Sequence, residues 1–249
     1  MITGAWDKME KVLDKLGVTE KVIFNGKDWG TGNFSMQALL QNLGRMKEHH
    51  LILINCGTKF ETMVASPGAV RSNIREYVKA GGRLLVTDFS YDYVEQVFPE
   101  FIDFEGSDHA STTQPESHNA AEVGSEGLTI MADIKDNQMK SWLKLPEIKA
   151  VQSNGKVKIV GFMTGWAVQK EVNLKTTTKV WVTGPAMWIG GKGDRPLTAS
   201  YYFQDTDKKG CGRVIFSSYH TYGNSKDLLP QERILEYLML EIGTCRIVE

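Results

Sequence analysis

The sequence predicts an α/β fold in which helices alternate with the strands of a parallel sheet. Helical and strand patterns alternate along residues 5–98, the order expected of strand–helix–strand crossovers. The run LILIN at 51–55 is apolar almost throughout, which is typical of parallel strands covered on both faces. A helix ending at Gly81 and Gly82 leads directly into a second such strand, RLLVT at 83–87.

Each helix of this first half is predicted by apolar residues at helical spacing. Gly17 ends the first helix, a Gly-rich loop at 26–33 precedes the second, and Ser66 with Pro67 predicts the start of the third. A short helix is expected at 91–97. The apolar stripes are Trp6, Met9, Leu13 and Leu16; Met36, Leu39, Leu40 and Leu43; and Val70, Ile74, Tyr77 and Val78. The expected strands are 21–25, 51–55 and 83–87.

The pattern changes after residue 105. Residues 106–127 are predicted to form a long polar loop, and four β-prone segments follow (LTIM, VKIVGFM, KVWVTG and TASYYF), interrupted by a helical patch at 137–143. A strand at 212–218 and a helix ended by Gly243 return to the earlier pattern. We therefore expect one domain over residues 1–249, in which 105–205 is a β-rich insertion, either a lid or a mostly antiparallel extension of the sheet.

Composition and charge exclude several classes of function. The chain has 29 Lys and Arg against 30 Asp and Glu, so its formal net charge of -1 gives no general attraction to nucleic acid or anionic lipid. Cys56, Cys211 and Cys245 form no CxxC pair, which indicates neither a disulfide framework nor a structural zinc site. The sequence carries no signal-peptide pattern and no run of about 18 apolar residues. We expect a cytoplasmic protein without a cofactor and without nucleic-acid or membrane partners.

Three segments resemble the class I glutamine amidotransferase-like superfamily, including its ThuA-like branch. They are LILINCG at 51–57 together with YVKAGGRLLVTD at 77–88, the late strand GCGRVIFSSYHT at 210–221, and the closing helix LLPQERILEYLMLEI at 228–242. The resemblance covers residues 20–104 and 210–243. It implies a flavodoxin-like, three-layer α-β-α fold with a mainly parallel sheet and a β-rich insertion. It also implies that His220 is the family's histidine.

The resemblance further implies that the family's catalytic triad is incomplete. Active members carry a Cys flanked by Gly on a tight strand-to-helix turn, where the helix N-terminus favours the thiolate. The matching stretch VTDFSYD at 86–92 contains neither Cys nor Gly, and Ser90 is the hydroxyl nearest its centre. Thr221 and Tyr222 stand where the family places an acid after its histidine. Glutamine hydrolysis by the family's route is therefore not expected.

Ligands of open parallel sheets bind beyond the carboxyl ends of the strands, so four segments are expected to converge on one rim. These are Asn25–Trp29, Asn55–Thr58, Asp88–Asp92 and Tyr219–Thr221. His220 is the candidate general base with Asp88 or Asp92 as its acidic partner, and Ser90 or Cys56 is the candidate nucleophile. The candidate ligand-binding residues are Asn25, Asp28, Trp29, Asn55, Thr58, Tyr91 and Asp92. Trp29 is suited to stack on a sugar or base.

Several of these residues also have a structural interpretation. Asp88, Ser90 and Asp92 have a spacing similar to the metal-ion adhesion motif of von Willebrand A domains, which could hold Mg²⁺. Helix capping by the two acids is preferred, and so is a buried structural role for Cys56. The acids and histidines of the polar loop match no zinc spacing and are interpreted as a solvated loop. They are Asp108, His109, Glu116 and His118. No metal site is expected.

Three functions remain open. The first is a non-catalytic binding or assembly module, with the aromatic-rich segment 181–188 as a surface for a protein partner or self-association. The second is a hydrolase of small molecules, sugars, esters or amides that uses His220 with Ser90 or Cys56. The third is a metal-dependent adhesion-type module at 88–92. Hydrogen-bond reach from His220 to Ser90, Cys56 or Asp88 in an open pocket would favour the second over the first.

Overall fold

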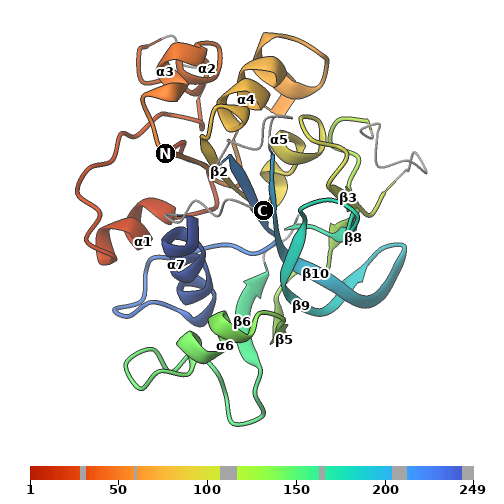
Figure 1. Ribbon diagram of the computed structural model, residues 1–249. Coiled ribbons are helices and arrows are strands. Elements are labelled where there is room, and N and C mark those ends of the chain that lie inside the picture. Colours follow the sequence, from red (N-terminus) through yellow and green to blue (C-terminus); the bar gives the residue numbers. More distant parts are fainter. Residues whose placement is uncertain (29–31, 59–60, 107–116, 163–165, 204–211, 243–249) are drawn as a thin grey trace.

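The computed structural model describes residues 1–28, 32–58, 61–106, 117–162, 166–203 and 212–242 (Figure 1). Within these ranges nine strands form one mixed sheet. The main path is β1-β2-β11-β10-β9-β4-β7, and β5 pairs with β9 and β6. The strands of this sheet are β1 (Leu51–Ile54), β2 (Arg83–Thr87), β4 (Val123–Gly124), β5 (Leu128–Ile134), β6 (Val157–Phe162), β7 (Trp166–Ala167), β9 (Lys179–Trp188), β10 (Gly191–Tyr202) and β11 (Arg213–Ser217). A separate pair is formed by β3 (Ile102–Phe104) and β8 (Gln169–Val172).

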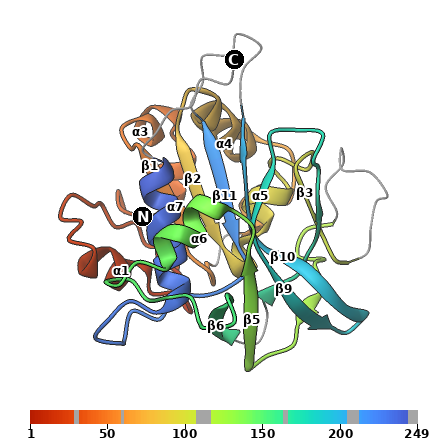
Figure 2. The same ribbon diagram turned by 60° about the horizontal axis from the view of Figure 1, so that its bottom comes forward.

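Helices cover this sheet. They are α1 (Met9–Lys15), α2 (Met36–Leu40), α3 (Leu43–Lys47), α4 (Ala69–Lys79), α5 (Asp92–Glu95), α6 (Asn137–Leu143) and α7 (Pro230–Ile242), with 3-10 turns η1 (Glu61–Val64) and η2 (Asp88–Ser90). Figure 2 shows α6 and α7 in front of the sheet and α4 behind it. No helix in the described ranges combines the length and hydropathy needed to cross a membrane.

The two faces of the sheet build two hydrophobic clusters, because successive strand residues point to opposite faces. Leu84 of β2 packs in the cluster that contains Tyr77 of α4. Its neighbour Leu85 packs in the cluster that contains Leu235 of α7. Burial on both faces explains why β1, β2 and β11 are apolar almost throughout. The α/β class is therefore confirmed, whereas the flavodoxin-like order of three layers stays a prediction.

The expectation of a mainly parallel sheet is wrong. β1 with β2 and β2 with β11 are the parallel pairs among the described strands, and the remaining pairs are antiparallel. The reason is that the middle of the chain returns by hairpins, which join antiparallel strands without a crossover helix. β9 and β10 form such a hairpin, and β10 pairs with β11, so this part of residues 105–205 extends the sheet. That residues 1–249 form one domain stays a prediction.

The expected strand at 21–25 is not a regular strand. Residues 1–3 lie between it and β1, because Ile2 bridges both Ile54 and Phe24. The Ile2 amide donates to the Leu53 carbonyl at 2.7 Å, and the Phe24 amide donates to the Met1 carbonyl at 2.8 Å. The predicted pairing of 21–25 with the sheet is therefore replaced by isolated bridges.

Two predicted helix boundaries also differ. The expected helix around Met36 is two short helices, because the Asn42 side chain accepts the Arg45 amide at 3.0 Å and begins α3. α4 begins at Ala69, after Ser66 and Pro67.

Candidate functional site

The carboxyl ends of β1, β2 and β11 meet at one edge of the sheet. The register aligns Ile54 with Val86 and Ser217 with Thr87, so the residues that follow these strands are neighbours. Cys56 follows β1, Asp88 follows β2 directly and His220 follows β11. This is the convergence expected of an open parallel sheet.

Cys56, Asp88 and His220 form what we call the strand-end cluster. The Cys56 Sγ, a carboxylate oxygen of Asp88 and a ring nitrogen of His220 all lie within 4.8 Å of one another, and all three residues are buried. His220 Nε2 lies 2.8 Å from Asp88 Oδ2. That distance suits an ion pair, but the groups are not aligned as a hydrogen bond. Neither His220 nitrogen has a hydrogen-bond partner among the described residues.

The backbone at Asp88 positions its carboxylate. Its φ of 47° lies in the left-handed region, which is uncommon for a residue other than glycine. The Ala167 amide of β7 donates to Oδ1 at 2.9 Å, so Oδ2 is the oxygen that faces His220. Asp88 stands at the strand-to-helix turn where the resemblance places the family's nucleophile, and its side chain is fully buried.

A buried network holds the three strand ends together. The Asp7 carboxylate accepts the Thr221 amide at 2.9 Å, and it also accepts the Thr221 and Thr87 hydroxyls. The Cys56 amide donates to Thr87 Oγ1 at 2.9 Å. Sequence reasoning missed Asp7, because its partners lie far away in the chain and no local pattern marks it.

Burial dominates the electrostatics of the cluster. It raises the pKa of the Cys56 thiol well above its ordinary value, and the Asp88 carboxylate raises it further. Burial likewise raises the pKa of Asp88, against the opposing effect of His220. Burial lowers the pKa of His220, but the Asp88 carboxylate more than offsets this and the net shift is upward. Both shifts favour retention of a proton at the Asp88–His220 pair.

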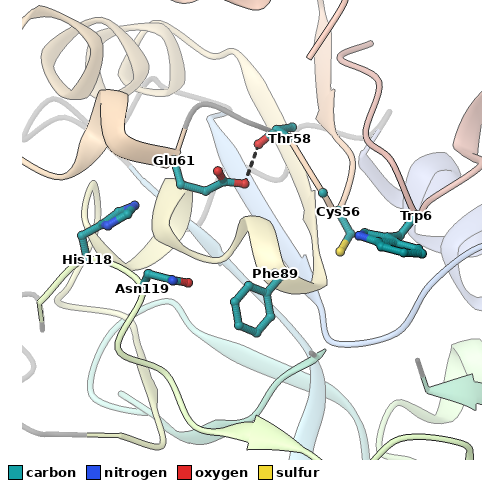
Figure 3. Close-up of a pocket in the computed structure, with 8 residues that line it drawn as sticks. Trp6, Cys56, Thr58, Glu61, Phe89, His118 and Asn119 are labelled. Atoms are coloured by element: carbon teal, nitrogen blue, oxygen red, sulfur yellow. Dashed lines mark hydrogen bonds between the residues drawn. The ribbon is translucent and has the colours of Figure 1, made fainter. Parts of the chain in front are cut away.

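A cavity of about 330 Å³ lies beside the cluster and is called the strand-end cavity below. It is lined by Trp6, Cys56, Gly57, Thr58, Glu61, Phe89, His118 and Asn119. Figure 3 shows Cys56 next to Trp6 on one side and His118 with Asn119 on the opposite side. Glu61 accepts the Thr58 hydroxyl at 2.8 Å. The lining combines aromatic rings with a carboxylate and an amide, groups that can contact a small polar molecule.

A second buried carboxylate lies behind the far wall of this cavity. Asp92 Oδ2 lies 3.5 Å from His118 Nε2 and accepts the Asn119 amide at 3.1 Å. Burial, with a contribution from Glu61, raises the pKa of Asp92 to about 7. Asp92 is therefore separate from the strand-end cluster, and the metal-capable group among the described residues contains Asp88 without Asp92.

The other predicted site residues are placed as follows. The Ser90 hydroxyl is buried and donates to the Asn55 carbonyl at 2.9 Å. The Asn55 side chain is buried, and the Tyr91 hydroxyl accepts the Ala121 amide at 2.9 Å. Thr58 lines the cavity, while Asn25 and Asp28 are exposed and do not line it. Trp29 lies outside the described residues, as do Asp108, His109 and Glu116.

Sequence reasoning missed most of the cavity wall. Trp6 was assigned to the first helix, but it precedes α1 and is 61% exposed. Glu61 and Asn119 carried no motif. His118 was interpreted as part of a solvated loop, yet it is partly buried against Asp92. The signal that could have found Trp6 is its position before a helix that begins only at Met9.

The aromatic segment 181–188 is less exposed than a partner surface requires. Trp181 is buried, and its indole N–H donates to Ser200 Oγ at 2.8 Å. Arg195 lies over the Trp188 ring, 4.5 Å from its centroid. The exposed apolar residues at this end of the hairpin are Met187 and Ile189. Binding of a protein partner stays a prediction.

Comparisons with known proteins show the fold. No protein-family model and no curated protein matches the chain. Among solved structures, the cytoplasmic protein STM3548 from Salmonella typhimurium is 14% identical with a TM-score of 0.50, covering 94% of this chain and 84% of that chain. A ThuA-like protein from Bacteroides uniformis ATCC 8492 is 11% identical with a TM-score of 0.51, covering 94% and 82%. The mmIFT52 N-terminal domain is 13% identical with a TM-score of 0.52, covering 98% and 97%. The chain therefore has a ThuA-like, amidotransferase-like fold, as the sequence predicted; likeness of fold alone assigns no activity.

Proposed function

We propose that the protein is a non-catalytic binding module whose strand-end cavity takes a small polar molecule. The observation that carries this proposal is the position of the cavity, at the carboxyl ends of the parallel strands and beside the buried cluster. Trp6 and Phe89 offer aromatic surfaces, and Glu61 and Asn119 offer polar atoms that can orient a ligand. We place the protein in the cytoplasm, as a further part of this proposal.

The side chains near the cavity support binding over covalent catalysis. The Ser90 hydroxyl is committed to the Asn55 carbonyl and is buried. His220 Nε2 faces Asp88 rather than a nucleophile. The turn after β2, where the fold would carry its nucleophile, presents a buried carboxylate. A general base needs hydrogen-bond reach to the group it deprotonates, and Ser90 is bonded elsewhere.

Thermal unfolding with a panel of sugars, amino acids, nucleotides and short carboxylic acids tests the proposal. A compound that binds the folded chain raises the unfolding midpoint in proportion to its saturation. We expect at least one compound to raise it, and Trp6→Ala and Glu61→Gln to weaken that compound's binding about tenfold or more, since each removes about 1.4 kcal/mol or more of contact energy.

Phe34→Ala is the matched control, because Phe34 is 62% exposed, close to the 61% of Trp6, and does not line this cavity. Its ligand binding should equal that of the wild type. A panel without any hit, or a hit that binds the Trp6 and Glu61 variants as tightly as the wild type, would contradict the proposal.

A hydrolase is the second candidate, because Cys56 does line the cavity and lies within 4.8 Å of both His220 and Asp88. An esterase, amidase and glycosidase screen separates it from the first. The binding proposal predicts no turnover above a Cys56→Ser, Ser90→Ala control. Turnover that disappears in Cys56→Ser and in His220→Ala would replace binding with catalysis.

A further inference from the structure

We propose that Cys56, Asp88 and His220 bind a divalent transition-metal ion of the zinc type. The three residues supply one sulfur, one oxygen and one nitrogen donor, all within 4.8 Å of one another and all buried. Zinc accepts this mixed donor set, whereas Mg²⁺ and Ca²⁺ prefer oxygen ligands alone. This inference goes beyond ligand binding in the cavity, because it rests on different atoms.

Unpartnered polar atoms face one another within the cluster. Asp88 Oδ2 and both ring nitrogens of His220 have no hydrogen-bond partner in the part of the chain that the structure describes. Buried polar groups in folded proteins are nearly always paired. A metal ion bound by Oδ2 and one ring nitrogen would satisfy atoms that are otherwise left without a partner.

The surroundings of the cluster fix two of its donors. The Ala167 amide holds Asp88 Oδ1 at 2.9 Å, which leaves Oδ2 free to act as a ligand. The Cys56 amide is held by Thr87 Oγ1 at 2.9 Å, which fixes the chain that carries the thiol. Such outer partners orient metal ligands in known sites. The 2.8 Å between Nε2 and Oδ2 is shorter than the roughly 3.3 Å that separates two ligand atoms on a tetrahedral zinc ion, so binding would part them by about half an ångström.

Charge at this end of the sheet favours a cation. A thiolate and a carboxylate balance the charge of a divalent ion. Asp7 adds a further buried carboxylate that acts on all three donors. Asp7 itself is bonded to Thr221 and Thr87, so it is not needed as a ligand. Arginine and lysine are absent from the lining of the adjacent cavity.

Three protein ligands leave one position of a tetrahedral ion open. Cys56 is the member of the cluster that also lines the strand-end cavity, so the ion would lie next to that cavity. Three ligands with an open position are typical of zinc sites that contact a small molecule, whereas purely structural sites are closed by a fourth side chain.

Metal titration of the full chain after chelator treatment and dialysis tests this inference. We expect Zn²⁺ and Co²⁺ to bind one ion per chain and to raise the unfolding midpoint. Co²⁺ should give a thiolate-to-cobalt charge-transfer band that is lost in Cys56→Ser. His220→Ala and Asp88→Asn should weaken Zn²⁺ binding by more than about 100-fold, since loss of an outer partner alone costs 10–100-fold.

The double variant Cys211→Ser, Cys245→Ser is the matched control and should keep full affinity and the charge-transfer band. The band of this control requires no substitution in the cluster, so misfolding of a ligand variant leaves the test intact. Absence of a one-to-one ion in the wild type, or a charge-transfer band that persists in Cys56→Ser, would overturn the inference. Ligand binding in the cavity is measured separately, so failure of one proposal is distinct from failure of the other.

Discussion

Asp88 Oδ2 lies 2.8 Å from His220 Nε2, although the two residues are far apart in the chain. They meet because β2 and β11 are parallel neighbours, with Thr87 aligned to Ser217. The pair is buried, and the Ala167 amide holds the other carboxylate oxygen. This contact joins the two segments that carry the resemblance to amidotransferase-like proteins. It places a carboxylate where such proteins carry a nucleophile.

Removal of Asp7 should destabilise the fold more than any exposed acid does. Asp7→Ala leaves the Thr221 amide and two buried hydroxyls without their acceptor. We expect the free energy of unfolding to fall by about 3 kcal/mol, because hydrogen bonds to a buried charged group are expensive to break. Urea unfolding measures this. Asp14→Ala, whose side chain is 63% exposed in its pair with Lys21, should cost less than about 1 kcal/mol. Equal costs for the two variants would show that the Asp7 network contributes little.

Glu232 should fix the loop that follows His220. Its carboxylate accepts the Tyr222 amide at 3.0 Å and the Gly223 amide at 2.8 Å, and its second oxygen accepts the Leu229 amide at 2.9 Å. Glu232→Ala should lower the free energy of unfolding by about 2–3 kcal/mol. Glu232→Gln keeps one acceptor oxygen and should cost less. A Gln variant as unstable as the Ala variant would contradict this assignment of the two oxygens.

The stability of the protein should depend on Asp92 between about pH 4 and pH 7. Its pKa is about 7 in the folded chain and near 3.9 when unfolded, so the folded state binds more protons between these values. Stability therefore falls as the pH rises through this window, by at most about 4 kcal/mol. Glu61, Arg71 and His118 are the charged or titratable groups that surround Asp92.

Asp92→Asn should remove this dependence while it keeps an acceptor for the Asn119 amide. We expect the variant to be more stable than the wild type at pH 8 and close to it at pH 4. Chemical unfolding at both pH values measures the difference. Asp133→Asn is the control, because Asp133 is exposed and its pKa is lowered by Lys156. An Asp92→Asn variant with the same pH profile as the wild type would refute the assignment.

Gly57 should be required for the shape of the cavity wall. Its φ is 80°, and an added Cβ would lie 2.6 Å from Trp6 Cδ1 and 3.0 Å from the Ala5 nitrogen. Gly57→Ala should cost about 2–3 kcal/mol and weaken ligand binding. Gly17→Ala separates the two causes, because Gly17 has a φ of 73° with nothing within 4 Å of an added Cβ. Gly17→Ala should cost about 1–2 kcal/mol and leave binding unchanged. Equal effects of both variants would exclude the clash with Trp6.

Local patterns predicted the elements whose partners are near in the chain. Strand β2 and the end of α4 were predicted because an apolar run follows a helix that ends in Gly-Gly. The strand at 21–25 failed because residues 1–3 occupy the position beside β1, a tertiary contact that no local pattern encodes. The mixed sheet was missed for a similar reason, since β10 adds antiparallel to β11.

The candidate site shows the same division. The rule that ligands bind beyond parallel strand ends placed Cys56, Asp88 and His220 on one rim, and the structure brings their side chains within 4.8 Å of one another. It could not exclude Ser90, whose hydroxyl is committed to the Asn55 carbonyl. The opposite wall, with Glu61 and Asn119, comes from segments outside the predicted strand ends and is set by tertiary packing.

Amide chemical shifts in the presence of the best compound of the ligand panel test the location of the binding site most directly. We predict that the amides of Gly57, Thr58 and Asn119 shift together, because they line one cavity of about 330 Å³. A larger cavity of about 660 Å³ lies elsewhere and is lined by Leu13, Leu16 and Met239, among others. Shifts confined to the strand-end cavity are the result that the binding proposal predicts. Shifts centred on Leu13, Leu16 and Met239, with Gly57, Thr58 and Asn119 unchanged, would contradict it.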